Sequence, residues 1–155
     1  MIAIRDYVAS DAGGCLGLFD GNTPGYFAPG ERPMLEAFLR RDDHEFFVAE
    51  ESGVVVGCGG FKVNEYGVGY LVWGIVSASR HGQGVGTALL RWRMARMREV
   101  PHAWCALLDT SQRTIRFFER FGFRAYRKVA DGYGAGLDKV YMRLTWQGDR
   151  LSTLL

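Results

Sequence analysis

The chain has 155 residues and a mass of 17.4 kDa, which is the size of one ordinary domain. Hydrophobic residues make up 48% and charged residues 23%, close to the globular average, so disordered, collagen-like and coiled-coil classes are excluded. The formal net charge of +2 is too small to imply a polyanionic partner, and nucleic acid is not expected as one. The 21 glycines against 4 prolines favour tight loops and close backbone approaches.

The cysteines indicate neither a disulfide framework nor a zinc site. They are three in number and lie far apart without a C-x-x-C pair, so we expect no metal and three buried, small hydrophobic side chains, at Cys15, Cys58 and Cys105. The start, Met1–Asp6, reaches charge too early for a signal peptide. The run 66–76 is far shorter than the ~20 apolar residues of a membrane helix. We therefore expect a cytoplasmic protein with no membrane partner.

The first half of the chain predicts two helices and four strands. In order they are a strand at Ile2–Arg5, a helix through Cys15–Phe19 capped by Ser10–Asp11, a helix opening at Arg32–Pro33, and strands at Phe46–Ala49, Val54–Val63 and Val68–Val76. Glu51–Gly53 is a hairpin turn. The strand at 68–76 is apolar enough to be buried on both faces.

The second half predicts two helices and three strands. They are a helix over Thr87–Glu99, a strand at Ala103–Leu108, a helix capped by Thr110 or Ser111 and ended by Gly122, and a final strand pair, Phe123–Val129 and Lys139–Trp146, joined by a glycine-rich loop. Strands and helices thus alternate as in an α/β or α+β domain. We expect one domain over residues 1–146, followed by a C-terminal tail at 147–155.

The segment richest in chemistry is a strand, a glycine loop and a helix at 71–94. Glycines at 82, 84 and 86 let the backbone turn sharply, and the following helix adds unpaired amides and a partial positive charge. Together they predict an anion site that suits phosphate or pyrophosphate. A P-loop is excluded because no Lys follows Gly86, and the Rossmann spacing G-x-G-x-x-G fails as well. The remaining alternative is an acyl-CoA loop.

Two motifs carry a family resemblance. His81–Gly86 fits the pattern R/Q-x-x-G-x-G/A, with His81 in the Arg/Gln position, and Ser111–Phe123 resembles the pattern N-x-x-A-x-x-F-Y-x-x-x-G-F. With these motifs about 25 residues apart and in this order, the chain resembles the GNAT superfamily of acetyl-CoA-dependent N-acyltransferases over nearly its whole length. The resemblance implies a mixed, mostly antiparallel sheet of about seven strands flanked by about four helices, in which the fourth and fifth strands splay apart.

The resemblance also implies an activity. An acetyl group would pass from acetyl-CoA directly to an amine, on a small molecule or a peptide, without an acyl-enzyme. A backbone N–H near Ile75 or Val76 would stabilise the oxyanion, which is typically worth about 2.7–4 kcal/mol. The residues implied in acetyl-CoA binding are Gly74, Ile75, Val76, His81, Gly82, Gln83, Gly84, Val85, Gly86, Thr87, Ser111 and Phe118.

The usual catalytic side chains are missing from this pattern. The Tyr that often protonates the leaving thiolate falls on Phe118, and a common base position on the fifth strand falls on Ala106. The catalytic residues are therefore unknown, with Tyr70, Asp109 and Glu31 as weak candidates. Glu31 is equally suited to a helix start and Asp109 to a helix cap.

The acceptor side is less defined. Tyr26, Phe27 and Tyr133 could wall a pocket, and Gly132–Gly136 could form a lid over it. Neither acidic residues that would select polyamines nor a basic cradle for acidic substrates stands out. The acceptor therefore stays open among small amines, amino acids, antibiotics and proteins.

Three further alternatives concern the helix after the loop and the assembly. Arg91, Arg93, Arg96 and Arg98 predict a solvated face, or contacts to the CoA 3′-phosphate or a dimer partner. A non-catalytic acyl-CoA-binding module is the main rival function, and a nucleic-acid accessory protein using the arginines is a weaker one. A homodimer is expected by analogy alone.

Overall fold

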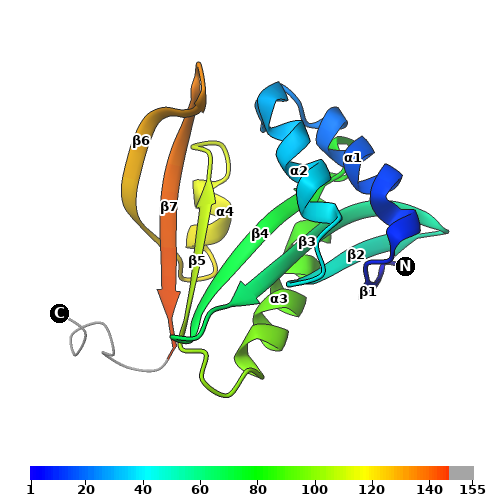
Figure 1. Cartoon of the computed structure of the whole chain (residues 1–155). Coiled ribbons are helices and arrows are strands. Elements are labelled where there is room, and N and C mark those ends of the chain that lie inside the picture. Colours follow the sequence, from blue (N-terminus) through cyan, green and yellow to red (C-terminus); the bar gives the residue numbers. More distant parts are fainter. Residues whose placement is uncertain (147–155) are drawn as a thin grey trace. The chain divides into compact units, whose positions relative to one another are not determined.

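The computed structural model describes residues 1–146 and contains eleven main elements, which Figure 1 labels. They are β1 (Ala3–Asp6), α1 (Ala12–Gly21), α2 (Arg32–Leu39), β2 (Glu45–Glu51), β3 (Val54–Val63), β4 (Val68–Val76), α3 (Val85–Arg98), β5 (Cys105–Thr110), α4 (Ile115–Glu119), β6 (Arg124–Gly134) and β7 (Leu137–Thr145). The order of strands and helices is the predicted one. The predicted tail at 147–155 lies outside the described residues.

The seven strands form one sheet in the order β1-β2-β3-β4-β5-β7-β6. β4 and β5 are parallel, whereas the pairs β1–β2, β2–β3, β5–β7 and β6–β7 are antiparallel. The pairing of β4 with β5 runs from Val68–Cys105 to Tyr70–Leu107, and β4 continues to Val76 beyond the last pair. The mixed, mostly antiparallel sheet with its partly paired fourth and fifth strands is therefore confirmed.

The chain forms two compact units, which are described separately. Unit 1 comprises Met1–Lys62 and Leu71–Arg96, and unit 2 comprises Val63–Tyr70 and the described residues from Met97 onward. β4 contributes to both units. The glycine loop lies in unit 1, and the final hairpin, β6–β7, lies in unit 2.

Unit 1 has an apolar cluster on each face of its strands. One cluster packs α1 and α2 against β2, β3 and β4 and includes Cys15, Phe19, Leu35, Val48 and Cys58. The other packs α3 against the same sheet and is made of Ala49, Val56, Val85 and Leu89. With both faces covered, six consecutive residues of β3 are buried.

Glycines in β3 permit the close packing of α3. A Cβ on Gly57 would lie 2.7 Å from Leu89 Cδ1, and one on Gly59 would lie 2.9 Å from the Arg93 guanidinium carbon. A side chain at either position would therefore force Leu89 or Arg93 to shift, which accounts for glycine here although glycine weakens a strand in general. The prediction that 68–76 is buried on both faces is wrong, because Tyr70 and Gly74 are exposed.

Unit 2 is built on β5, β7 and β6. Its core comes from the three strands and the segments before them and includes Met97, Trp104, Cys105, Phe123 and Met142. β6 extends to Gly134, so most of the glycine-rich stretch predicted as a loop and lid is strand. The hairpin instead turns at 135–136, where Gly136 has a positive φ of 79°. All three cysteines of the chain are buried and free, as predicted.

Two predicted helix caps are absent. Asp11 occupies the N-cap position of α1 without a side-chain cap, because its carboxylate accepts hydrogen bonds from Arg5 and from the Val8 N–H. α4 begins at Ile115, and its N-cap residue, Thr114, makes no capping hydrogen bond. The Thr114 hydroxyl instead contacts the Thr110 hydroxyl, so other partners nearby in the chain take up both side chains.

Candidate functional site

The glycine loop connects β4 to α3 through two residues in the left-handed region. Gly82 has φ 76° and Gly84 has φ 90°, conformations that favour glycine. The helix begins at Val85, two residues earlier than predicted, and the Ala88 N–H donates to the Gly84 carbonyl at 3.0 Å. Gly86 and Thr87 therefore belong to the first turn of α3.

This geometry fits an anion. The first amides of a helix have no partner within it and carry the positive end of the helix dipole. No atom lies within 4 Å of where a Cβ would sit on Gly82 or Gly84, so a ligand can approach the loop backbone there. The Val85 side chain is fully buried, so Val85 can offer a ligand only its backbone.

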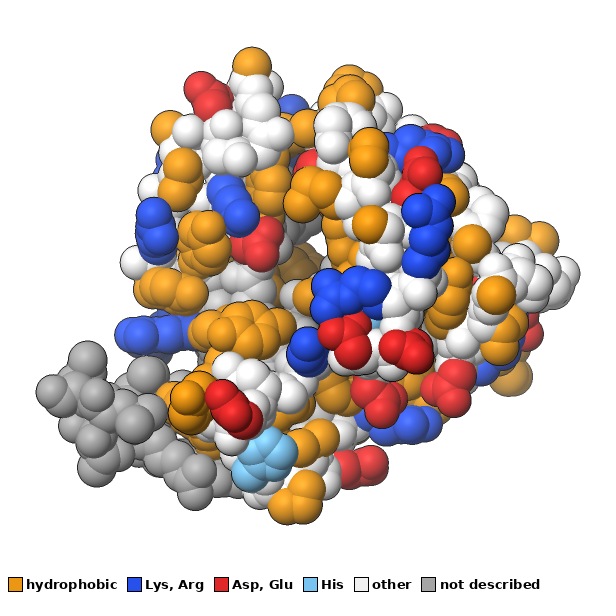
Figure 2. All heavy atoms as spheres, viewed as in Figure 1, with side chains coloured by type: hydrophobic (Ala, Val, Ile, Leu, Met, Phe, Trp, Pro, Cys, Tyr) orange, Lys and Arg blue, Asp and Glu red, His pale blue; other side chains and the backbone are white. Residues whose placement is uncertain are grey.

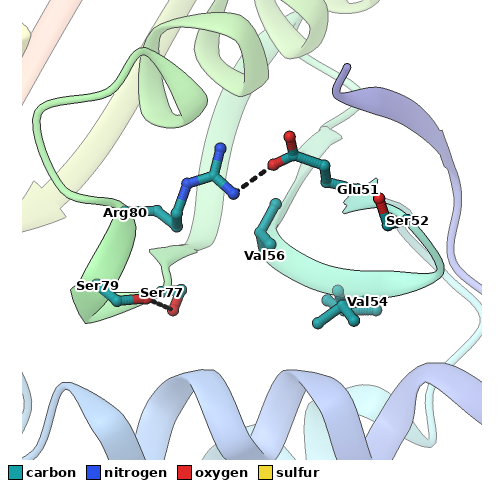
Figure 3. Close-up of a pocket in the computed structure, with 8 residues that line it drawn as sticks. Glu51, Ser52, Val54, Val56, Ser77, Ser79 and Arg80 are labelled. Carbon is teal, nitrogen blue, oxygen red and sulfur yellow. Dashed lines mark hydrogen bonds and ion pairs between the residues drawn. The ribbon is translucent and has the colours of Figure 1, made fainter.

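The loop is anchored at its start by Arg80. The Arg80 guanidinium forms an ion pair with Glu51 on β2, and its Nε donates to Gln83 Oε1 at 2.9 Å. This hydrogen-bonded ion pair lowers the pKa of Glu51. Arg80 and Glu51 line a pocket of about 360 Å³. Figure 3 shows Arg80 and Glu51 pointing toward one another, with the Ser77 and Ser79 hydroxyls in contact on the same side as Arg80. The Gln83 side chain accepts a hydrogen bond from Arg80 and donates one to the Ser79 carbonyl, so it stabilises the loop from within.

The end of β4 is held by two side chains that donate to one carbonyl. His81 Nε2 lies 3.0 Å from the Val76 carbonyl oxygen, and Asn22 Nδ2 donates to the same oxygen at 2.9 Å. Asn22 is buried and also donates to the Leu18 carbonyl at 2.7 Å. The His81 ring meets Tyr26 edge-on at 5.0 Å, so a predicted loop residue and a predicted acceptor residue are brought together.

β4 bends at Trp73, just before the segment implied in thioester binding. Trp73 has a positive φ of 49°, which is uncommon for a bulky residue. Its ring stacks on Phe27, with centroids 6.3 Å apart. Gly74, next along the strand, is exposed, whereas the Ile75 side chain is buried in the α1–α2 cluster. Phe27 thus supports the strand, and Ile75 can offer only its backbone.

Arg93 corrects the prediction of a solvated arginine face on α3. Its side chain is 4% exposed, and Nη1 and Nε donate to the Gly60 and Leu89 carbonyls at 3.4 and 3.3 Å. Burial lowers the pKa of Arg93 to about 10. No carboxylate among residues 1–146 pairs with it, although Arg91 on the same helix is exposed as expected.

Two of the three weak catalytic candidates lie in unit 2. Tyr70 is exposed on β4, in register with Leu107. Asp109 lies within β5, and its carboxylate accepts a hydrogen bond from the Tyr133 hydroxyl. The third candidate, Glu31, lies in unit 1 and accepts the Ala28 N–H at 2.8 Å, as a residue at a helix start does.

The two helix residues implied in acetyl-CoA binding also lie in unit 2. Ser111 is buried, and its hydroxyl accepts the Arg113 N–H at 3.3 Å. Phe118 packs edge-on against Phe117 and Phe123, with centroids 5.0 and 5.9 Å apart. The ring of Phe118 is thus part of an aromatic cluster.

Sequence reasoning missed Asn22, Trp73 and Arg93. Asn22 stands in a stretch typical of a turn, and nothing in its neighbourhood signals a partner 54 residues away. Nothing in the sequence distinguishes Arg93 from the three other arginines of the same helix. Within the described part of the chain, no three His, Cys, Asp or Glu side chains gather as metal ligands would, and no helix there could cross a membrane.

Comparison with known proteins identifies the family. The model of the acetyltransferase (GNAT) family matches residues 15–123, more than half of the chain, so the chain belongs to that family. It is 32% identical over 122 residues to an amino-acid acetyltransferase of Ralstonia nicotianae (strain ATCC BAA-1114 / GMI1000). That match covers 77% of this chain and 26% of the relative, so the chain spans about a quarter of the relative's length.

Solved structures share the fold. A chain from Desulfovibrio desulfuricans, described as an acetyltransferase of the GNAT family, aligns over 94% of this chain and 99% of its own, with 24% identity and a TM-score of 0.79. An aminoglycoside 6′-N-acetyltransferase complexed with coenzyme A aligns over 92% and 96%, with 13% identity and a TM-score of 0.75. At these identities the likeness concerns the fold alone.

Proposed function

We propose that the protein is an N-acetyltransferase that moves an acetyl group from acetyl-CoA directly to an amine. The proposal rests on the loop at Gly82–Gly84. Its two glycines have positive φ angles, the loop leads directly into α3, and no atom obstructs the backbone at either glycine. The pyrophosphate of acetyl-CoA suits this loop. The complex of the related aminoglycoside acetyltransferase with coenzyme A supports the same ligand class.

In the proposed reaction the acceptor nitrogen attacks the thioester carbonyl carbon. The N–C bond forms, the C–S bond breaks, the CoA thiolate leaves, and the amine loses one proton. The backbone of Gly74–Val76 on β4 binds the acetyl-CoA arm as an added strand would and donates an N–H to the developing oxyanion. The bend at Trp73 and the two side chains on the Val76 carbonyl hold this segment.

The proton acceptor stays a prediction among Tyr70, Asp109 and Glu31. The Asp109 carboxylate accepts a hydrogen bond from the Tyr133 hydroxyl, and the Glu31 carboxylate accepts one from the Ala28 N–H. Because Phe118 has no hydroxyl, water protonates the departing thiolate in this proposal. A cytoplasmic location and a homodimer stay predictions.

Calorimetric titration with acetyl-CoA tests the binding half of the proposal. We expect Gly84→Ala to weaken acetyl-CoA binding at least tenfold, because a left-handed φ costs a residue with a Cβ roughly 1–2 kcal/mol and the loop would shift. Gly13→Ala is the matched control, since Gly13 lies on α1 with no atom within 4 Å of its Cβ position. Equal binding by both variants, or none by the wild type at millimolar acetyl-CoA, would refute this site.

Thiol release with a panel of amines tests the catalytic half. A protein that binds acetyl-CoA and releases CoA with no amine in the panel would be the non-catalytic acyl-CoA-binding module instead.

A further inference from the structure

The open face of unit 2 is defined by the alternation of β7. Val140 and Met142 are buried, and Leu144 lies beside Gly122, the residue that ends the turn after α4. Successive side chains of a strand point to opposite faces. Lys139, Tyr141 and Arg143 therefore lie on the face that α4 does not cover.

Cations and tyrosines alternate on this face. Lys139 Nζ lies 5.2 Å and the Arg127 guanidinium carbon 5.3 Å from the centroid of Tyr141, and Arg143 lies 5.5 Å from that of Tyr126. The two tyrosine rings are 6.2 Å apart. We call these five residues the basic–tyrosine surface. Figure 2 shows Lys and Arg side chains beside hydrophobic ones, the class that includes Tyr, over β6 and β7.

The positive charge of this surface is not neutralised within the described residues. Arg127, Lys139 and Arg143 form no ion pair there, whereas Lys128 on the same hairpin pairs with Asp138 at 3.2 Å. One carboxylate, Asp109, stands opposite Tyr141 in the β5–β7 register. Three cations against one carboxylate favour an anionic ligand.

The spacing favours an extended ligand with several carboxylates. Lys139 and Arg143 are four residues apart, about 13 Å along a strand, and Arg127 stands across from Tyr141, between them. One carboxylate cannot reach all three cations, but alternate side chains of an extended peptide repeat every ~7 Å. Small molecules prefer concave pockets, whereas this face is a strand surface.

Nucleic acid fits this surface less well. Single strands bind through aromatic rings on which bases stack. Here guanidinium or ammonium groups already lie over the rings of Tyr126 and Tyr141, where a base would have to stack. The cations remain able to bind carboxylates at their outer edges, because Arg127 and Arg143 are exposed.

We propose that the basic–tyrosine surface binds an extended acidic polypeptide. The three cations are separated by up to 16 positions in the chain and meet only through the β6–β7 pairing.

Two fluorescent peptides of equal length test the proposal, Ala-Glu-Gly-Glu-Gly-Glu and Ala-Gln-Gly-Gln-Gly-Gln, each amidated at its carboxyl end. Binding is followed by fluorescence anisotropy. We expect at least tenfold tighter binding of the glutamate peptide, with a preference that shrinks as salt rises. Each single substitution, Arg127→Gln, Lys139→Gln or Arg143→Gln, should reduce the preference roughly 2- to 5-fold.

Lys128→Gln is the matched control, because it removes the same charge from the hairpin at an ion-paired position. It should leave the preference unchanged, and all four variants should bind acetyl-CoA as the wild type does. Equal binding of both peptides, a preference unaffected by the three substitutions, equally tight binding of free glutamate, or tighter binding of an oligothymidylate would each overturn the proposal.

Discussion

Replacing the buried arginine of α3 should stabilise the protein. Arg93 is 4% exposed, and no carboxylate among residues 1–146 pairs with it. Burial lowers its pKa to about 10, so at neutral pH the guanidinium is still charged in the fold, and that charge is less favourable there than in the unfolded chain. At 1.36 kcal/mol per pKa unit, this costs the folded state about 3 kcal/mol at neutral pH.

Arg93→Met removes the charge and keeps a long, flexible side chain that can fill the space beside Gly59 and Gly74. It also removes two long hydrogen bonds to the Gly60 and Leu89 carbonyls, worth about 1 kcal/mol each at most. The expected net gain in the free energy of unfolding is about 1–2 kcal/mol. In a chain of this length, that raises Tm by roughly 2–8 °C.

Urea denaturation at pH 7 and calorimetric melting are the assays, with two comparison variants. Arg93→Lys keeps a buried charge and should be less stable than Arg93→Met. Arg91→Met, at an exposed position on the same helix, should change the free energy of unfolding by less than about 0.5 kcal/mol. If Arg93→Met lowered that free energy by 1 kcal/mol or more, the guanidinium would be a net stabiliser and the reasoning would be refuted.

Three further substitutions test the packing around the site by denaturant unfolding. Gly60→Ala should lower the free energy of unfolding by about 1–3 kcal/mol, because its Cβ would collide with a β2 carbonyl; an unchanged value would mean that β3 shifts freely. Asn22→Ala should cost about 1–3 kcal/mol, because it removes a buried donor to the Val76 carbonyl, and a neutral effect would contradict the anchoring of β4. The hydrogen bond from Arg5 lowers the pKa of Asp11 in the folded protein below its ordinary value of 3.8. The ionised carboxylate therefore stabilises the fold fully above pH 3.8, and this stabilisation is lost as the pH falls through the pKa of the folded protein. Asp11→Asn should therefore lose stability at pH 7 and depend less on pH between 5 and 2, whereas an unchanged pH profile would exclude this coupling.

The local signals in the sequence were sufficient for the element order and the loop. Alternating apolar residues and turn residues predicted every main strand and helix in order, and the glycines at 82 and 84 predicted a sharp turn that the φ angles confirm. These features depend on a few adjacent residues. A glycine at positive φ before a helix is determined largely by the chain within that turn.

Contacts between distant segments decided the rest. Asn22 meets Val76 only because α1 packs on β4, and Arg93 is buried only because glycines of β3 lie beneath α3. Likewise, Gly132–Gly134 lie in β6 instead of the predicted loop, and Gly134 pairs with Leu137 of β7.

The sequence by itself thus determined the class of fold, the family and the sharp glycine turn before α3, because periodicity and short motifs are local properties of the chain. Only the tertiary structure decided which charges are buried, which side chains hold β4, and where cations gather with tyrosines. Burial and charge balance depend on strand pairing and helix packing, which bring together residues that no spacing rule connects.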